Sequence, residues 1–243
     1  MGLDWDEISR IRDRLRALEI RSLTSQKFQD DLLRLAEAHV SSGDCLIEVG
    51  SFHGGLTAQL ACAAKSLDTW LDVVELSEEM IGRTRRAVEA CGHPERVRYH
   101  CTGLDAFVRQ AGVSIKPALV FLDADHSYEA VKSDIRAVYE LPNRPEIFAF
   151  HDYSLRYAGE WADKINVARA INELLPADRL IKIGDKPGIH PDLRTTPQSD
   201  GHYHQEGEPE GVYVYCREVR LKGQRRARLA QWCARLTGGA RAS

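Results

Sequence analysis

The first forty residues carry apolar side chains at three- and four-residue spacing, which is the period of amphipathic helices. The two apolar stripes consist of Ile8, Ile11, Leu15 and Leu18, and of Phe28, Leu32, Leu35 and Ala36. Thr24 or Ser25 precedes the second stripe and is of a residue type that caps helix N-termini. The pattern predicts two helices that form an N-terminal helical extension over residues 1–42. Their apolar stripes also offer surface for a homodimer contact.

From residue 43 onward, short apolar runs alternate with longer stretches of helical periodicity. The apolar runs predict strands at 45–50, 70–76, 97–101, 118–123, 147–152, 180–183 and 211–216. The helical stretches lie at 56–64, 78–91, 104–111, 128–141 and 166–175. Strands that alternate with helices form parallel sheets covered by helices, so residues 43–218 are predicted to form one α/β domain.

Two polar segments interrupt or follow this domain. Residues 184–210 are rich in Gly, Pro, His and acids and are predicted to form a long loop. Residues 219–243 form a basic tail, within which 219–236 have the pattern of a terminal helix. From Arg217 to Ser243 there are eight Lys or Arg and one acid, a local charge of +7.

The overall charge argues against a general nucleic-acid binder. The 33 basic and 36 acidic residues give a net charge of -3, so no basic field covers the molecule outside the tail. With 43% hydrophobic residues, the chain of 243 residues can build a core and is not of a disordered type. It lacks the roughly 18 consecutive apolar residues of a membrane span.

The N-terminus and the cysteines both favour a cytoplasmic protein. Asp4, Asp6 and Glu7 stand where a secretory signal would be basic, and no apolar run follows them. The six cysteines form no C-x-x-C pair, so neither a disulfide framework nor a zinc site is indicated.

Glycines follow the first predicted strand of the α/β domain. In Glu48-Val49-Gly50-Ser51-Phe52-His53-Gly54-Gly55, the three glycines let the backbone approach a ligand and turn tightly into a helix. The dinucleotide fingerprint G-x-G-x-x-G is absent, which disfavours a pyrophosphate site. Glu75 ends the second strand, where a carboxylate in such folds accepts hydrogen bonds from ribose hydroxyls.

Acids and histidines gather at the ends of two further strands. Asp123, Asp125 and His126 follow the fourth strand, and His151 and Asp152 follow the fifth. Because the carboxyl ends of neighbouring parallel strands meet at one edge of the sheet, these side chains are predicted to surround one point. Such a group is costly unless a cation or proton transfer offsets the repulsion, so it is the predicted active site.

At these residues, from about 46 to 153 and more loosely to 216, the chain resembles class I S-adenosylmethionine-dependent methyltransferases. It is most similar to the small-molecule O-methyltransferases of the macrocin O-methyltransferase and cephalosporin hydroxylase-like group, and more distantly to catechol and caffeoyl-CoA O-methyltransferases. The resemblance implies a Rossmann-like, doubly wound, mostly parallel seven-stranded sheet with an antiparallel last strand. It implies cofactor contacts from Glu48, Gly50, Ser51, Phe52, His53, Gly54, Gly55, Glu75, Leu76, Gly103, Leu104 and Asp123.

The metal-dependent relatives imply a divalent cation, magnesium or manganese, on Asp123, His151 and Asp152. This chain departs from their pattern because it has a histidine at 151, and imidazole suits manganese, iron or zinc better than magnesium. His151 therefore changes the metal or marks a site that works without one. Asp125, His126 and His151 are the candidate general bases.

The resulting hypothesis is methyl transfer from S-adenosylmethionine to a hydroxyl of a small molecule, such as a sugar or natural product, with or without a metal. The alternatives are a non-catalytic protein that binds S-adenosylmethionine, a partner-dependent accessory protein in oxygenation, and a nucleic-acid methyltransferase. The acidic cluster argues against the last of these because it would repel phosphate.

Overall fold

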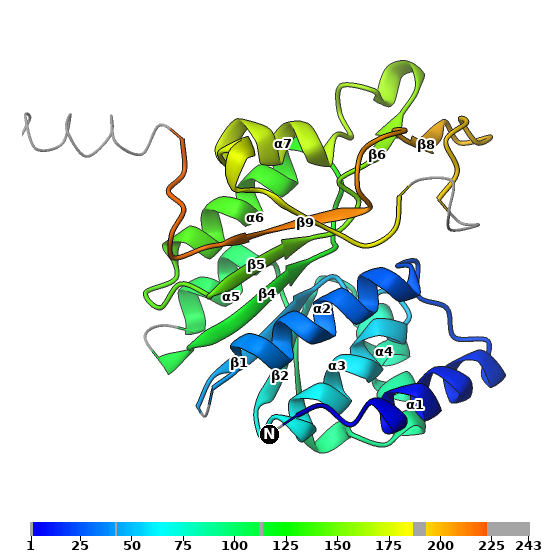
Figure 1. The fold of residues 1–243 in the computed structure, drawn as a ribbon, viewed down its shortest axis with the longest axis vertical. Coiled ribbons are helices and arrows are strands. Elements are labelled where there is room, and N and C mark those ends of the chain that lie inside the picture. The colour runs from blue at the N-terminus through cyan, green and yellow to red at the C-terminus, as the bar shows by residue number, and fades with distance from the viewer. Residues whose placement is uncertain (1, 42, 112–113, 187–192, 223–243) are drawn as a thin grey trace, which may run out of the picture.

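The computed structural model describes residues 2–41, 43–111, 114–186 and 193–222 (Figure 1). Its α-helices are α1 (Trp5–Ala17), α2 (Gln26–His39), α3 (Gly55–Ser66), α4 (Glu78–Cys91), α5 (Leu104–Ala111), α6 (Tyr128–Glu140) and α7 (Val167–Leu174). Its strands are β1 (Cys45–Val49), β2 (Trp70–Glu75), β3 (Val97–Cys101), β4 (Pro117–Leu122), β5 (Ile147–Phe150), β6 (Leu155–Tyr157), β7 (Ile181–Ile183), β8 (His202–His204) and β9 (Gly211–Tyr215).

Seven strands form one sheet in the order β3-β2-β1-β4-β5-β9-β7. The strands β1 to β5 are parallel, whereas β9 runs antiparallel to both of its neighbours, β5 and β7. This confirms the predicted mostly parallel sheet of seven strands with an antiparallel last strand. The chain reverses its direction of winding between β1 and β4, so the crevice beyond their carboxyl ends is the expected ligand position.

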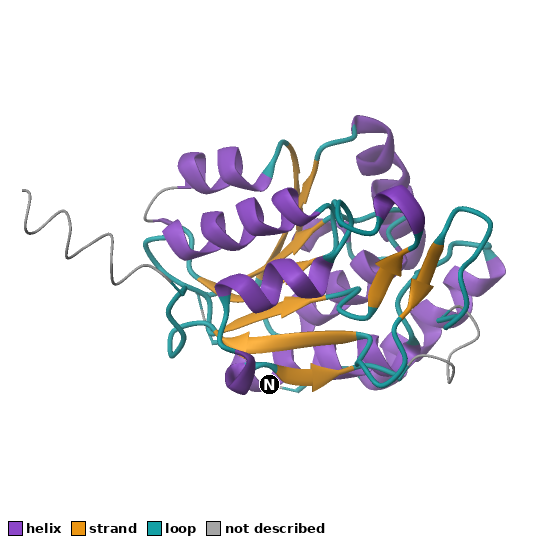
Figure 2. Cartoon of the chain, turned by 90° about the horizontal axis from the view of Figure 1, so that it is seen from above, coloured by secondary structure: helices purple, strands orange, loops and turns teal. Residues whose placement is uncertain are grey.

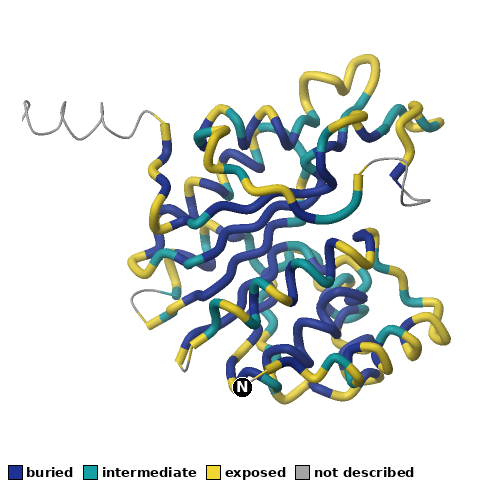
Figure 3. The backbone as a smooth tube through the Cα atoms, viewed as in Figure 1, coloured by how far each residue is buried: buried dark blue, intermediate teal, exposed yellow. Residues whose placement is uncertain are grey.

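Helices cover both faces of this sheet (Figure 2). Side chains of α1 to α4 share one apolar cluster with one face of the sheet, and those of α5 to α7 share a second cluster with the other face. Within β1, Leu46 belongs to the first cluster while Ile47 and Val49 belong to the second, as the alternation of side chains along a strand requires. The central strands are buried along their length (Figure 3).

The N-terminal helices are part of the first cluster. Phe28 and Leu32 of α2 are fully buried together with Phe121 of β4. Arg12 of α1 donates hydrogen bonds to Gln59 Oε1 of α3 at 2.7 Å and to Asp30 of α2 at 2.6 Å. The two helices are therefore held against the sheet domain by both apolar and polar contacts.

The segment predicted as a long loop contains a strand that the sequence analysis missed. Strand β8 pairs antiparallel with β6 in a second, two-stranded sheet beyond the carboxyl ends of the main strands. Both strands are three residues long, too short to show periodicity. The first four residues of the predicted tail helix, 219–222, are not helical: Val219 and Leu221 pack into the second apolar cluster, and Lys222 N donates to Leu174 O at 2.8 Å. The rest of the predicted tail helix lies outside the described residues, as do residues 187–192. No helix in the described part of the chain has the length and apolarity to cross a membrane.

Candidate cofactor and catalytic site

A cavity of about 620 Å³ lies beyond the carboxyl ends of β1, β2 and β4. This volume is within the usual range for small-molecule sites. Of the residues that the sequence analysis assigned to the site, all except His53 and Gly54 line this cavity, namely Glu48, Gly50, Ser51, Phe52, Gly55, Glu75, Leu76, Gly103, Leu104, Asp123, Asp125, His126, His151 and Asp152. The topology thus brings residues from five strand ends to one place.

Gly50 lets the turn after β1 approach the end of β4. Its φ is +83°, and a Cβ at this position would lie 2.1 Å from the backbone oxygen of Asp123. Only a residue without a side chain fits both the torsion and the approach. Gly50 therefore fixes the distance between the glycine turn and the acidic cluster.

Two residues of the same motif face away from the cavity. Gly54 has a φ of +82°, and a Cβ there would lie 2.8 Å from Thr84 Cα of α4, so it serves helix packing. His53 stacks on Phe52 with ring centroids 3.8 Å apart, and its Nε2 lies 2.8 Å from Arg83. The structure thus places both residues behind the ligand space.

The carboxylate of Glu75 is held by two backbone amides. Ser51 N donates to Glu75 Oε2 at 3.2 Å, and Ser77 N donates to Oε1 at 2.9 Å. Each carboxylate oxygen keeps a second acceptor position for a ligand hydroxyl. Leu76 follows directly and is 74% exposed at the cavity, an unusual position for a large apolar side chain and a suitable surface for a flat ring.

Glu48 is a buried carboxyl group at the cavity wall. Its side chain is only 1% exposed, and its Oε2 has no hydrogen-bond partner within the described residues. Burial raises the pKa of Glu48 to about 8, and the charges of Asp123 and Glu75 act in the same direction. A positively charged ligand group beside Glu48 would relieve this penalty.

Asp123, His126 and Asp152 form the tightest acid–histidine group among the described residues. One ligand atom from each lies within 4.8 Å of the others. His126 Nε2 is buried, lies 2.9 Å from Asp152 Oδ2 and 3.5 Å from Asp123 Oδ1, and makes no well-aligned hydrogen bond. Asp152 adopts a φ of +54°, which is uncommon for a residue with a side chain. The metal set expected from the sequence had His151 in the place that His126 takes here.

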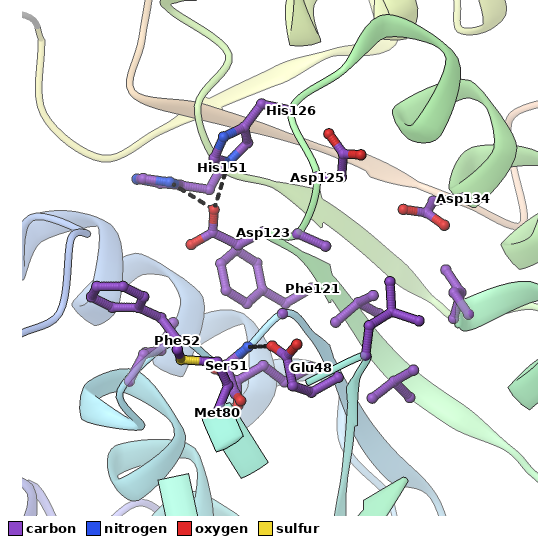
Figure 4. Close-up of a pocket in the computed structure, with 18 of the residues that line it drawn as sticks. Glu48, Ser51, Phe52, Met80, Phe121, Asp123, Asp125, His126, Asp134 and His151 are labelled. Atoms are coloured by element: carbon purple, nitrogen blue, oxygen red, sulfur yellow. Dashed lines mark hydrogen bonds and ion pairs between the residues drawn. The ribbon is translucent and has the colours of Figure 1, made fainter. Parts of the chain in front are cut away.

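His151 has a carboxylate at each ring nitrogen, and Figure 4 shows the first of them, that of Asp123. Its Nδ1 lies 3.2 Å from Asp123 Oδ1, and its Nε2 lies 3.1 Å from Glu210 Oε1. Because an ionised carboxylate only accepts hydrogen bonds, both nitrogens are placed as donors. Burial opposes the charged imidazole, but the charges of Asp152 and Asp123 outweigh it and hold the pKa of His151 well above its ordinary value. In this arrangement no nitrogen of His151 is free to bind a metal.

The same interactions set the pKa of Asp152 and the pKa of His126. Burial disfavours the ionised form of Asp152, but the positive charges of His151 and His126 hold its pKa well below its ordinary value. Burial also opposes the charged form of His126, yet Asp152 and Asp123 raise its pKa to about 10. In the free protein the cluster is therefore a set of ion pairs.

Asp125 and Asp134 form the acidic wall on the other side of the cavity (Figure 4). Asp125 Oδ1 accepts a hydrogen bond from Ser127 N at 2.8 Å, just before α6 begins. Burial raises the pKa of Asp134 to about 7, and the charges of Asp125 and Asp105 add to the shift. Sequence analysis missed Asp134 because it lies in mid-helix, where an acid carries no site signal.

Two further parts of the site were missed and come from distant parts of the chain. Glu210, 0% exposed, precedes β9 and accepts from Ser25 N at 2.7 Å and from Asp185 N at 2.9 Å, besides His151. Residues 21–24, between α1 and α2, line the cavity beside Gly55. No local motif marks either part, although an acid directly before an apolar strand was a weak signal for Glu210.

The solved structures that resemble this chain define its fold. An O-methyltransferase from Bacillus cereus in complex with S-adenosylhomocysteine (SAH) has a TM-score of 0.57 at 16% identity, covering 89% of this chain and 91% of that one. The O-methyltransferase TomG from Streptomyces achromogenes, in complex with S-adenosylmethionine and involved in tomaymycin synthesis, has a TM-score of 0.55 at 17% identity, covering 89% and 90%. A SAM-dependent O-methyltransferase from Thermotoga maritima has a TM-score of 0.54 at 16% identity, covering 84% and 70%.

The chain therefore has the Rossmann-like α/β fold of methyltransferases. Its segment 47–153, which runs from β1 to the residue after Asp152, matches the model of a family described as a methyltransferase domain. No curated protein matches the chain. The matched segment contains the acidic cluster but includes neither residues 21–24 nor Glu210.

Proposed function

We propose that this protein transfers the methyl group of S-adenosylmethionine to a hydroxyl of a small molecule, with a divalent cation at Asp123, His126 and Asp152. The observation that carries the proposal is one continuous cavity that joins Glu48 and Glu75 at one end to the acid–histidine group at the other. The first end suits a nucleoside with an amino-acid group, and the second suits the oxygen that receives the methyl group. The O-methyltransferases of the same fold support this choice of reaction.

The cofactor end of the cavity supplies groups that match S-adenosylmethionine. Glu75, held by two backbone amides, is placed to accept the ribose hydroxyls. Leu76 offers an exposed apolar face for the adenine, beside Gly103 and Leu104. The absence of the dinucleotide fingerprint agrees with a ligand that has no pyrophosphate.

The donor set of the acid–histidine group fits a divalent cation. It offers two carboxylates and one imidazole, a combination that suits manganese, iron or zinc better than magnesium. His126 Nε2 is a buried nitrogen without an aligned partner, and the nearby Asp152 is held in a rarely adopted backbone conformation. When bound, such a cation lowers the pKa of an acceptor hydroxyl.

The residues around this group position the acceptor and receive its proton. His151 is fixed between Asp123 and Glu210 and balances their charges, so it is not placed to remove a proton. With His126 assigned to the cation, Asp125 is the candidate base that stays on the cavity wall. Methyl transfer itself needs an in-line approach, which the rigid strand ends supply by orientation.

The test is binding of SAH, measured by titration calorimetry with chelator, manganese or magnesium, followed by methyl transfer from a labelled donor to a panel of hydroxylated acceptors. We expect SAH to bind without metal, and labelled product to require it. Asp152→Ala should abolish product formation and keep SAH binding. His202→Ala, which removes a surface histidine paired with Asp200, is the control and should change neither.

Each negative result has a distinct meaning. Failure of SAH to bind would refute the methyltransferase proposal as a whole. Binding of SAH together with full activity of Asp152→Ala would remove the acid–histidine group from the reaction. Transfer that proceeds equally well with chelator would refute the cation. Binding without product on any acceptor, with the cation present, would favour a non-catalytic protein.

A further inference from the structure

Arg21 stands out at the cavity because the other charged groups there are acids and histidines. It lies in the connection between α1 and α2 and, among the described residues, is the only Lys or Arg that lines the cavity. It makes no hydrogen bond or ion pair with any residue in the described part of the chain. By contrast, Arg12 and Arg16 nearby are paired with Asp30 and Asp13.

The backbone of Arg21 is packed against the start of α3. A Cβ on Gly55, the first residue of α3, would lie 2.9 Å from the backbone oxygen of Arg21. The absence of a side chain at Gly55 is what lets the connection cross the helix end so closely. The amides of this helix end have no side-chain cap, so the positive end of α3 and Arg21 lie together at one wall.

Glu48 lines the same cavity as Arg21, and its carboxyl group is negative when it is ionised. It is almost fully buried, and its Oε2 has no partner within the described residues. Glu48 Oε2, which has no partner in the described part of the chain, and the exposed guanidinium of Arg21 line one cavity and match a ligand that carries both an ammonium and a carboxylate. The amino-acid end of S-adenosylmethionine is such a group.

We propose that Arg21 binds the carboxylate of the cofactor's amino-acid end while Glu48 receives its ammonium group, so that the N-terminal extension completes the cofactor site. This inference rests on the proposed function, since it assigns the orientation of the same cofactor. It makes Arg21 a residue that selects for cofactor forms that keep the carboxylate. It also gives the connection between α1 and α2 a binding role besides packing.

The experiment compares two ligands that differ only in the amino-acid end. SAH carries this end, whereas 5′-methylthioadenosine keeps the nucleoside and the thioether without it. For Arg21→Ala we expect SAH to bind about 10- to 100-fold more weakly, the range for a lost hydrogen bond between charged groups. Methylthioadenosine should bind as it does to the unmodified protein, and Arg21→Lys should restore part of the SAH affinity.

Arg16→Ala is the matched control because Arg16 is a nearby arginine that lines a second, adjoining cavity and is already paired with Asp13. It should change neither affinity. Equal weakening of both ligands by Arg21→Ala would show a structural role and overturn the inference. So would unchanged SAH affinity with a raised KM for the acceptor, because Arg21 would then serve the acceptor. If the unmodified protein does not bind SAH, the proposed function fails and the inference fails with it. If it binds SAH and Arg21→Ala leaves that affinity unchanged, only the inference fails.

Discussion

The most informative single substitution is Glu210→Gln. The two oxygens of Glu210 accept hydrogen bonds from the backbone and hydroxyl of Ser25, from Asp185 N and from His151, and the side chain is completely buried. Glutamine has nearly the same shape, but it replaces one acceptor oxygen with a donor. At least one of the surrounding donors then faces another donor, and His151 loses a charged partner.

The expected loss of unfolding free energy is about 3–5 kcal/mol, the usual cost of removing one partner from a buried ion pair. Glu208→Gln is the matched control, since Glu208 lies two residues away, is partly exposed and pairs with Arg156 at the surface. Its loss should be about 0–1 kcal/mol. Both values come from urea unfolding with chelator present, followed by circular dichroism.

The pH dependence of this loss of unfolding free energy shows whether it comes from the ion pair of Glu210 and His151 or from packing alone. Burial opposes the ionised form of Glu210, but the hydrogen bond and charge of His151 lower its pKa below 4.5, so its stabilisation is present above pH 4.5 and is lost as the pH falls through the lowered pKa. The pKa of His151 is raised above 6.5, so its share is complete below pH 6.5 and declines as the pH rises toward the raised pKa. The difference between Glu210→Gln and the unmodified protein should therefore be largest between about pH 4.5 and 6.5. A difference that is the same at all pH values, or no larger than that of Glu208→Gln, would refute the reasoning.

Two other predictions concern the cavity wall. Gly50→Ala should lower the unfolding free energy by about 1–3 kcal/mol more than Gly92→Ala, because both glycines have positive φ but only Gly50 has a backbone oxygen in the way; equal losses in urea unfolding would contradict this. SAH affinity should fall by about tenfold per pH unit as the pH drops below 8, because Glu48 must ionise to receive the ligand's ammonium group. Calorimetry between pH 6 and 8 tests this, and Glu48→Gln should remove most of the slope; a flat profile for the unmodified protein would show that Glu48 stays neutral in the complex.

The fold was predictable because its signals are local. The strands β1, β2 and β4 are short apolar runs buried on both faces, and glycines such as Gly50 and Gly92 mark where each element ends. The meeting of Asp123 with His151 and Asp152 followed from the same pattern, since parallel neighbours share one edge. Strand order and residue type were enough to locate this edge.

The choice between two histidines was not predictable in the same way. His126 lies three residues after Asp123 in a turn, and only the path of that turn brings its Nε2 within 2.9 Å of Asp152. His151 directly follows a strand, but its orientation depends on Glu210, which is 59 positions away in the sequence. Spacing within a motif gives no information on a contact of that separation.

Ser25 and Glu210 are in contact, and both lie outside the segment 47–153 that matches the family model. These residues are 185 positions apart, and each lies outside 47–153, on opposite sides of it. Ser25 also caps α2 by accepting from Phe28 N, and the ring of Phe28 packs edge-on against His151 at 4.9 Å. The segments before and after 47–153 thus meet at Ser25 and Glu210, and Phe28 and Glu210 contact His151. The segment 47–153 alone would leave His151 without Glu210 and the cavity without Arg21. The acids of the proposed site therefore lie within this segment, whereas the groups that hold His151 and add a positive charge to the cavity come from both flanking segments.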